Sequence, residues 1–216
     1  MELLCVQKEY AVLRKLPGEE CETQLPALVC EALGGEAYCV HRLDRAVGGV
    51  MVYARTKAAA AALGAQMQEH SFEKEYLAVV SGRPEANEGV LHDFLYKDPL
   101  KGRAFAVKSK RSGVKEAELS YKLLAAAPYE GGEASLVRVT LHTGRFHQIR
   151  CQFASRKMPL LGDGKYGSRE KRCTVALMSC RIGFTDPQSG ERVSFSAEPE
   201  RVFPWDLFPE ISATAP

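Results

Sequence analysis

Apolar and polar residues alternate in two parts of the chain, and this period of two predicts paired β-strands. Apolar residues occupy every second position of 119–123 and of 137–141, which flank a glycine-containing turn at 130–133. A second pair of alternating stretches lies within 182–195, around a turn at 186–190. We therefore expect two antiparallel strand pairs.

Two further stretches have the pattern of helices. Thr56 is a suitable N-cap for a helix over 57–69, a stretch that is rich in alanine. The stretch 146–157 predicts a second helix, with Ile149 and Phe153 four residues apart on one face. Both helices are expected to pack an apolar face against the sheet.

The continuous apolar run 76–80, which ends before Gly82, predicts a buried strand. Strands joined by turns, with a few helices between them, indicate an α+β fold: a mixed, largely antiparallel sheet flanked by helices. The sequence lacks the glycine-rich motifs of nucleotide-binding folds. No linker interrupts it, so we expect a single domain over residues 1–208 and a flexible tail over residues 209–216.

The composition is that of a soluble globular protein, since 45% of the 216 residues are hydrophobic and 26% are charged. The apolar runs are much shorter than the ~20 residues that span a bilayer, so no membrane segment is expected. Residues 1–8 carry an acid where a secretory signal has positive charge, which favours a cytoplasmic protein. The seven cysteines form no CxxC pair, which is typical of a reducing compartment and predicts neither a zinc site nor a redox site.

Positive charge is concentrated in two segments, although the net charge is only +2. Residues 97–115 contain seven basic residues and one acidic residue, and residues 145–172 contain eight basic residues and two acidic ones. Such segregation is typical of a face that binds phosphate groups. A solvated hairpin at 97–115 is the alternative interpretation of the same charges.

Asp44 is the first candidate for chemistry. It lies between Arg42 and Arg45 and shortly before the pair Gly48 and Gly49. Two neighbouring guanidinium groups stabilise an ionised carboxylate, as a catalytic aspartate requires. A structural ion pair would leave the same pattern in the sequence.

A second candidate is the segment 142–150, which brings hydrogen-bond donors to the start of a predicted helix. Backbone N–H groups and the helix dipole favour an anion at such a position. The histidines at 142 and 147 have no further ligands at metal-binding spacing, so no metal site is expected. The donors that can bind a phosphate or a carboxylate are Arg145, His147, Gln148 and Arg150.

Tyr76 is the third candidate, because within the strand 76–80 it either packs in the core or presents its ring to a flat base. Together these segments resemble the RluA-type family of RNA pseudouridine synthases. The resemblance covers about residues 40–203 and implies the pseudouridine synthase fold, a mixed sheet flanked by helices. It is carried by four strings: HRLDR at 41–45, KEYLAVVSG at 74–82, HTGRFHQIR at 142–150 and LGDGKYG at 161–167.

The resemblance implies an activity and a role for several residues. A synthase of this family breaks the C1′–N1 bond of a uridine, turns the base and joins it again through C5, with no cofactor. Asp44 matches the catalytic aspartate, Tyr76 the active-site tyrosine and Arg145 the arginine that pairs with the aspartate. We expect further contacts to the substrate from Arg42, Arg45, His147, Gln148, Arg150, Lys165 and Leu177, the last of which walls the base.

The expected partner is RNA, either tRNA or ribosomal RNA, with the target uridine flipped out of a loop. Neither a membrane nor an obligate protein partner is expected. The sequence departs from the family at 46–49, where Ala-Val-Gly-Gly replaces the usual ending Thr-Ser-Gly, and at Met178, beside the base-wall leucine. The small RNA-binding domain that precedes Asp44 in many members is expected to be missing.

Two other functions are compatible with parts of the same sequence. An RNA-binding protein of the same fold, inactive because of the altered loop at 46–49, is the first alternative. The second is a hydrolase that uses Cys39 or Ser81 with His41 or His142, but no nucleophile elbow supports it.

Overall fold

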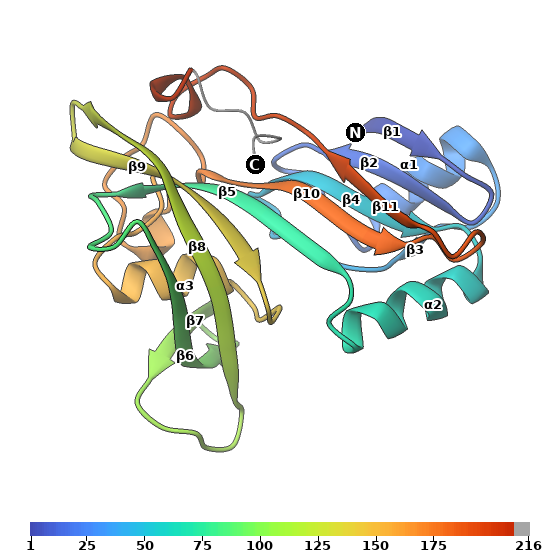
Figure 1. Ribbon diagram of the computed structural model, residues 1–216, viewed down its shortest axis with the longest axis horizontal. Helices are drawn as coiled ribbons and strands as arrows, with labels where there is room; N and C mark the ends of the chain where they lie inside the picture. Colours follow the sequence, from blue (N-terminus) through green and yellow to red (C-terminus); the bar gives the residue numbers. More distant parts are fainter. Residues whose placement is uncertain (210–216) are drawn as a thin grey trace. The chain divides into compact units, whose positions relative to one another are not determined.

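The computed structural model describes residues 1–209, which form two compact units (Figure 1). The first unit consists of residues 1–74 and 178–199, and the second of residues 75–177 and 200–209. The single domain over 1–208 stays a prediction. The expected tail, 209–216, lies outside the described residues except for Pro209.

The first unit is built on a mixed sheet in the order β1–β2–β4–β10–β11. The pairs β1–β2, β2–β4 and β10–β11 are antiparallel, whereas β4 and β10 run parallel, with β3 added to β4. The hairpin expected within 182–195 is confirmed, since Ile182 lies opposite Phe195. The elements are β1 (Glu2–Val6), β2 (Tyr10–Lys15), α1 (Gln24–Leu33), β3 (Tyr38–Cys39), β4 (Gly48–Ala54), α2 (Lys57–Gln68), β10 (Leu177–Thr185) and β11 (Arg192–Ser196).

The parallel pairing of β4 and β10 depends on Gly49. Its φ of 121° lies in the region that favours glycine, and a Cβ there would stand 2.2 Å from the carbonyl oxygen of Ser179. Ala46 and Val47, which stand where the family pattern has Thr-Ser, thus lead directly into a tight strand contact. Val47 is 1% exposed, so the hydroxyl of a serine at this position would face the interior.

The predicted helix over 57–69 is confirmed as α2, Lys57–Gln68. Thr56 caps its beginning as expected, because Ala59 N donates to the Thr56 side chain at 3.2 Å. Its buried residue Leu63 packs with Phe72, Ile182 and Phe184 in the core of the first unit. The apolar side chains of β4 complete this core, so the strand that follows the Asp44 loop is anchored along its whole length.

The second unit contains an antiparallel sheet in the order β5–β9–β8–β6–β7. The alternating stretches 119–123 and 137–141 pair as expected, with Tyr121 opposite Val139. The long strands β8 and β9 curve together in Figure 1. The elements are β5 (Glu73–Ser81), β6 (Glu88–Asp98), β7 (Arg103–Val107), β8 (Val114–Tyr129), β9 (Gly132–Leu141), α3 (Gln148–Ser155) and the short 3-10 helices η1 (Gly164–Tyr166) and η2 (Trp205–Leu207).

The helix expected over 146–157 is shorter in the structure. It is α3, Gln148–Ser155, and it begins two residues late because His147 has a left-handed backbone with φ 51°. Ile149 and Phe153 are both buried, as their spacing predicts. Among residues 1–209, no helix is both long enough and apolar enough to cross a bilayer.

Candidate active site

Asp44 lies in the loop 40–47, between β3 and β4 of the first unit. Side chains alternate along this loop: His41 and Leu43 are buried, whereas Arg42 is exposed and Asp44 is half-buried. The backbone then turns, with Val47 N donating to Asp44 O at 2.9 Å. The two buried neighbours anchor the loop and leave the Asp44 carboxylate at the surface of its unit.

Lys15, at the end of β2, holds the same loop from the inside. It is 1% exposed, and its Nζ donates to the carbonyl oxygens of Asp44 at 3.4 Å, Arg45 at 3.1 Å and Val47 at 2.6 Å. Burial lowers the pKa of Lys15. The sequence predicts no such role for Lys15, because the carbonyl groups of Asp44 and Val47 lie 29 and 32 residues further along the chain.

His41 fixes the beginning of the loop to β4. Its Nε2 accepts a hydrogen bond from Val52 N at 3.3 Å, and its ring lies 5.5 Å from the ring of Phe72. Burial, with a smaller contribution from the charge of Lys74, lowers the pKa of His41 to about 3. The ring is therefore neutral at physiological pH and acts as an acceptor within the unit.

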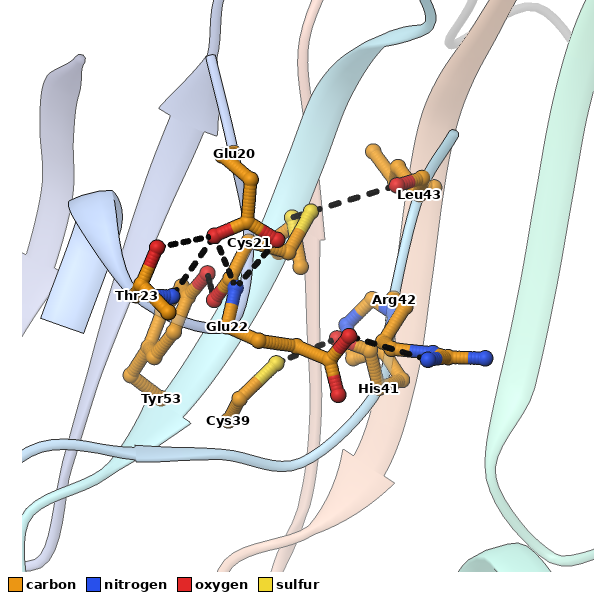
Figure 2. Close-up of polar contacts among 10 residues, drawn as sticks. Glu20, Cys21, Glu22, Thr23, Cys39, His41, Arg42, Leu43 and Tyr53 are labelled. Atoms are coloured by element: carbon orange, nitrogen blue, oxygen red, sulfur yellow. Dashed lines mark hydrogen bonds and ion pairs between the residues drawn. The ribbon is translucent and has the colours of Figure 1, made fainter. Parts of the chain in front are cut away.

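Arg42 and Arg45 extend from the loop into solvent. Arg42 Nη1 lies 2.9 Å from Glu22 Oε2 (Figure 2). Both side chains are more than half exposed. Arg45 Nε donates to Gly18 O at 3.0 Å. An exposed ion pair contributes only about 0–1 kcal/mol, so the Arg42 guanidinium can exchange its carboxylate for another anion at little cost.

Tyr76 and Leu177 are both buried in the second unit. Tyr76 lies on β5 opposite Val139 of β9, and Leu177 is the first residue of β10. Asp44 belongs to the first unit, so its pairing with Arg145 of the second unit stays a prediction.

Arg145 stands on a turn that Gln148 holds in place. Gln148 Oε1 accepts from Arg145 N at 2.9 Å and from the Thr143 hydroxyl at 2.9 Å, while its Nε2 donates to Glu118 O at 3.0 Å. The half-buried Arg145 side chain donates from Nε to Glu116 O at 2.8 Å. Gln148 is itself buried, so the structure gives it a supporting position, and its contact with RNA stays a prediction.

Arg150 and His147 also have partners within the second unit. The buried Arg150 guanidinium lies 2.7 Å from the carboxylate of Asp163, and His147 Nδ1 lies 3.1 Å from the Tyr166 hydroxyl. Lys165, by contrast, is exposed and donates to Gly102 O at 3.0 Å. Among the expected substrate contacts, Arg42, Arg45 and Lys165 are thus the exposed cations.

The basic segment 97–115 covers β7 and parts of β6 and β8, and most of its cations are exposed. Lys97 lies 4.6 Å above the ring of Phe146, and Arg103 lies 4.6 Å from the ring of Tyr166. Cations over aromatic rings are held in place by the ring quadrupole. The segment therefore carries exposed positive charge beside the half-buried ring of Phe146 and the buried ring of Tyr166.

Comparisons with known proteins identify a family that this chain resembles over most of its length. The model of the family described as RNA pseudouridylate synthase matches residues 2–155. A protein of Aquifex aeolicus (strain VF5), named an uncharacterized RNA pseudouridine synthase, is 35% identical in an alignment 174 residues long that covers 76% of this chain and 54% of that protein. Ribosomal large subunit pseudouridine synthase D of Zymomonas mobilis is 34% identical in an alignment 169 residues long that covers 74% of this chain and 51% of that protein. The chain spans about half the length of these curated relatives.

A solved structure shares the fold. Human RNA Pseudouridylate Synthase Domain Containing 1 superposes with a TM-score of 0.81 at 23% identity, covering 95% of this chain and 85% of that chain. At this identity the likeness shows the fold alone. The predicted α+β fold, with its mixed and largely antiparallel strands, is confirmed.

Proposed function

Because this chain belongs to the RNA pseudouridylate synthase family, we propose that it isomerises a specific uridine of a structured RNA to pseudouridine. The substrate is tRNA or ribosomal RNA, and the protein works in the cytoplasm without a cofactor. The family match and the identity to the Zymomonas mobilis enzyme support this proposal. The observation that carries it is the half-buried Asp44 on a loop whose backbone is fixed by the buried Lys15.

The reaction requires a carboxylate of this kind. When the C1′–N1 bond of the uridine breaks, C1′ becomes electron-poor, as in glycoside cleavage, and an ionised carboxylate can attack it. The freed uracil turns, and its C5 then displaces the carboxylate from C1′. The proton of C5 leaves to solvent, and N1 takes up a proton. Every atom of the nucleotide except that exchanged proton is kept, so neither a redox partner nor a group donor is needed.

In this proposal Asp44 attacks C1′ and must remain ionised. Arg145 pairs with it, lowering the energy of the charged form and fixing its orientation. Tyr76 stacks on the flipped uracil and accepts the C5 proton, while Leu177 walls the base as it turns. His147, Gln148 and Arg150 complete the segment that presents Arg145.

RNA binding is assigned to the exposed cations. Arg42, Arg45 and Lys165, together with the basic segment 97–115, would contact phosphate groups, whose neutralisation releases counterions and makes affinity depend on salt. A uridine in a loop leaves its stack more readily than one in a duplex, so a loop is the proposed target.

Tritium release tests the proposal. RNA carrying 5-tritiated uridine, as bulk tRNA and as ribosomal RNA in separate reactions, is incubated with the unaltered protein and with Asp44→Asn. We expect release from one of the two pools by the unaltered protein and none by the variant. Glu191→Gln, an exposed acid of the first unit that has no proposed role, is the matched control and should behave as the unaltered protein.

Two results would contradict this proposal, the first its assignment of Asp44 and the second the isomerase itself. Release by Asp44→Asn at the normal rate would remove Asp44 from the chemistry. If neither pool releases tritium while both bind tightly and with salt dependence, the protein is an RNA-binding member of the family that has lost turnover.

A further inference from the structure

Two cysteines contact the same loop as Lys15, but at its other end. Cys39 Sγ donates to His41 O at 3.0 Å, and Cys21 Sγ donates to Leu43 O at 3.3 Å (Figure 2). Lys15 binds carbonyl oxygens from Asp44 onward, whereas the thiols bind those just before it. The peptide that leads to Asp44 is therefore held from both directions by side chains.

The two thiols come from separate parts of the first unit. Cys39 ends β3, immediately before the loop, and Cys21 lies in the turn that precedes α1. That turn is fixed by the Glu20 carboxylate, which accepts from Thr23 N at 2.6 Å, and by the Tyr53 hydroxyl, which donates to Cys21 O at 2.8 Å. Cys21 is thus fixed independently of the loop that it contacts (Figure 2).

Both thiols are suited to donate. Burial raises the pKa of Cys21, and burial together with the neighbouring Cys21 raises the pKa of Cys39 to about 11, so each sulfur keeps its proton near neutral pH. Cys21 Sγ also lies 3.6 Å from Met51 Sδ, but a carbonyl oxygen is a better acceptor than a thioether. Neither sulfur is a ready nucleophile in this state.

A thiol is a weak donor, so these contacts add little to the free energy of folding. Their effect is geometric: they fix the carbonyl oxygens of His41 and Leu43, and with them the peptide planes 41–42 and 43–44, the second of which leads directly into Asp44. A displacement of about 1 Å at a reacting group can lower turnover by about 100-fold. The contacts therefore act on the rate through orientation.

We propose that Cys21 and Cys39 are positioning residues, which orient Asp44 through the carbonyl oxygens of His41 and Leu43. The inference rests on the proposed function, in which the Asp44 carboxylate attacks C1′. It adds to that function the claim that neither thiol touches the RNA, so their loss changes turnover and leaves RNA affinity unaltered.

The test separates turnover from binding. Rates of tritium release are measured over a range of RNA concentrations for Cys21→Ala, Cys39→Ala, the double variant and the corresponding serine variants. We expect each alanine variant to lower kcat about threefold to tenfold and the double variant further, with KM within about twofold of normal. Serine keeps a hydroxyl donor and should restore most of kcat. Cys30→Ser, in the half-buried cysteine of α1, is the matched control and should leave both constants unchanged.

A second readout does not depend on the RNA. The S–H stretching band lies in an infrared region free of other protein absorptions, and a thiol that donates to a carbonyl absorbs at lower frequency than a free one. Spectra of the unaltered protein minus Cys39→Ser, and minus Cys21→Ser, should each show one shifted band. If the alanine variants do not fold, the serine variants and these difference spectra still decide.

The outcomes distinguish the inference from the function on which it rests. If the unaltered protein releases tritium and Asp44→Asn does not, the function stands, and alanine variants with normal kcat overturn only the positioning role. Difference bands at the frequency of free thiols also overturn it. If the unaltered protein releases no tritium from either RNA pool, the proposed function and this inference both fall.

Discussion

The guanidinium of Arg150 binds the carboxylate of Asp163 at two points, Nε to Oδ2 at 2.7 Å and Nη2 to Oδ1 at 2.8 Å. Both side chains are buried, and the pair joins α3 to the residues just before η1. The arginine that the sequence suggested as a contact to RNA is thus engaged inside its unit. Gln148, the first residue of α3, accepts the hydrogen bond that holds the Arg145 turn. By fixing α3, the Arg150–Asp163 pair therefore also stabilises this turn.

Asp163→Asn should lower the free energy of unfolding by about 3–5 kcal/mol, because it leaves a buried guanidinium without its counter-charge. Urea denaturation at neutral pH measures the change. The matched control is Glu116→Gln, which breaks an exposed pair with Lys110 and should cost at most about 1 kcal/mol. Equal losses of unfolding free energy in the two variants would show that the buried pair contributes no more to stability than the exposed pair.

The stability of the protein should fall in mild acid because of His41. Its pKa is about 3 in the folded protein and about 6.5 in the unfolded chain, so the unfolded state binds more protons between these values. The free energy of unfolding therefore decreases as the pH drops through this window, by up to about 1.4 kcal/mol per pH unit from this residue. Above pH 6.5 the contribution of His41 is constant.

His41→Gln keeps an acceptor for Val52 N and removes the titration. Urea denaturation between pH 4 and pH 8 should give a flatter profile for this variant than for the unaltered protein. His92→Gln changes an exposed histidine of the second unit and should leave the profile unchanged. A profile for His41→Gln that matches the unaltered protein would contradict the buried neutral ring.

Lys15→Met should lower both stability and turnover. The carbonyl oxygen of Val47 loses its 2.6 Å bond, and a buried acceptor without a partner costs about 1–3 kcal/mol. The loop then has more freedom around Asp44, so kcat should fall more than KM changes. Lys8→Met, in an exposed lysine, is the control, and a Lys15→Met protein with normal kcat would show that the loop needs no support from β2.

Glu22→Gln should strengthen RNA binding. The change releases the exposed Arg42 from its ion pair, and since such a pair is worth at most about 1 kcal/mol, the gain in affinity should not exceed about fivefold. Filter binding at several salt concentrations measures it, and Glu191→Gln makes the same change in net charge elsewhere. If Glu22→Gln and Glu191→Gln gain equally in affinity, the effect is one of overall charge and Arg42 does not contact the RNA. If only Glu22→Gln gains, adding Arg42→Gln to it should abolish the gain.

Tyr76→Phe should keep the stacking surface and lose the hydroxyl. If that hydroxyl accepts the C5 proton, product formation should fall by about tenfold or more while RNA affinity stays the same. Tyr121→Phe removes another hydroxyl of the second unit, which donates to Ala86 O, and serves as the control. An unchanged rate in Tyr76→Phe would limit this residue to stacking.

Local patterns in the sequence predicted α2, α3, β5 and two strand pairs, because each depends on neighbours a few residues apart, whereas α1, β1, β2, β6 and β7 had no prediction. The Thr56 cap, the strand pair within 114–141 and the late hairpin all appear where the periodicity indicated them. The start of α3 was wrong by two residues, since the left-handed backbone of His147 has no signal in the hydrophobic pattern. The strings around Asp44 and Arg145 also sufficed to identify the family.

The sequence by itself therefore determined two of the helices, two of the strand pairs, the family and the candidate chemistry, each of which depends on a short stretch of residues. Only the tertiary structure decided what supports them. The donors that hold the Asp44 loop, Lys15 and Cys21, lie 32 and 22 residues from the carbonyl groups that they bind, and neither pairing has a local pattern. Likewise, the sequence predicts that Arg150 contacts the substrate, whereas in the structure it is buried against Asp163. Burial and long-range hydrogen bonds depend on the packed chain, and so they could be seen only there.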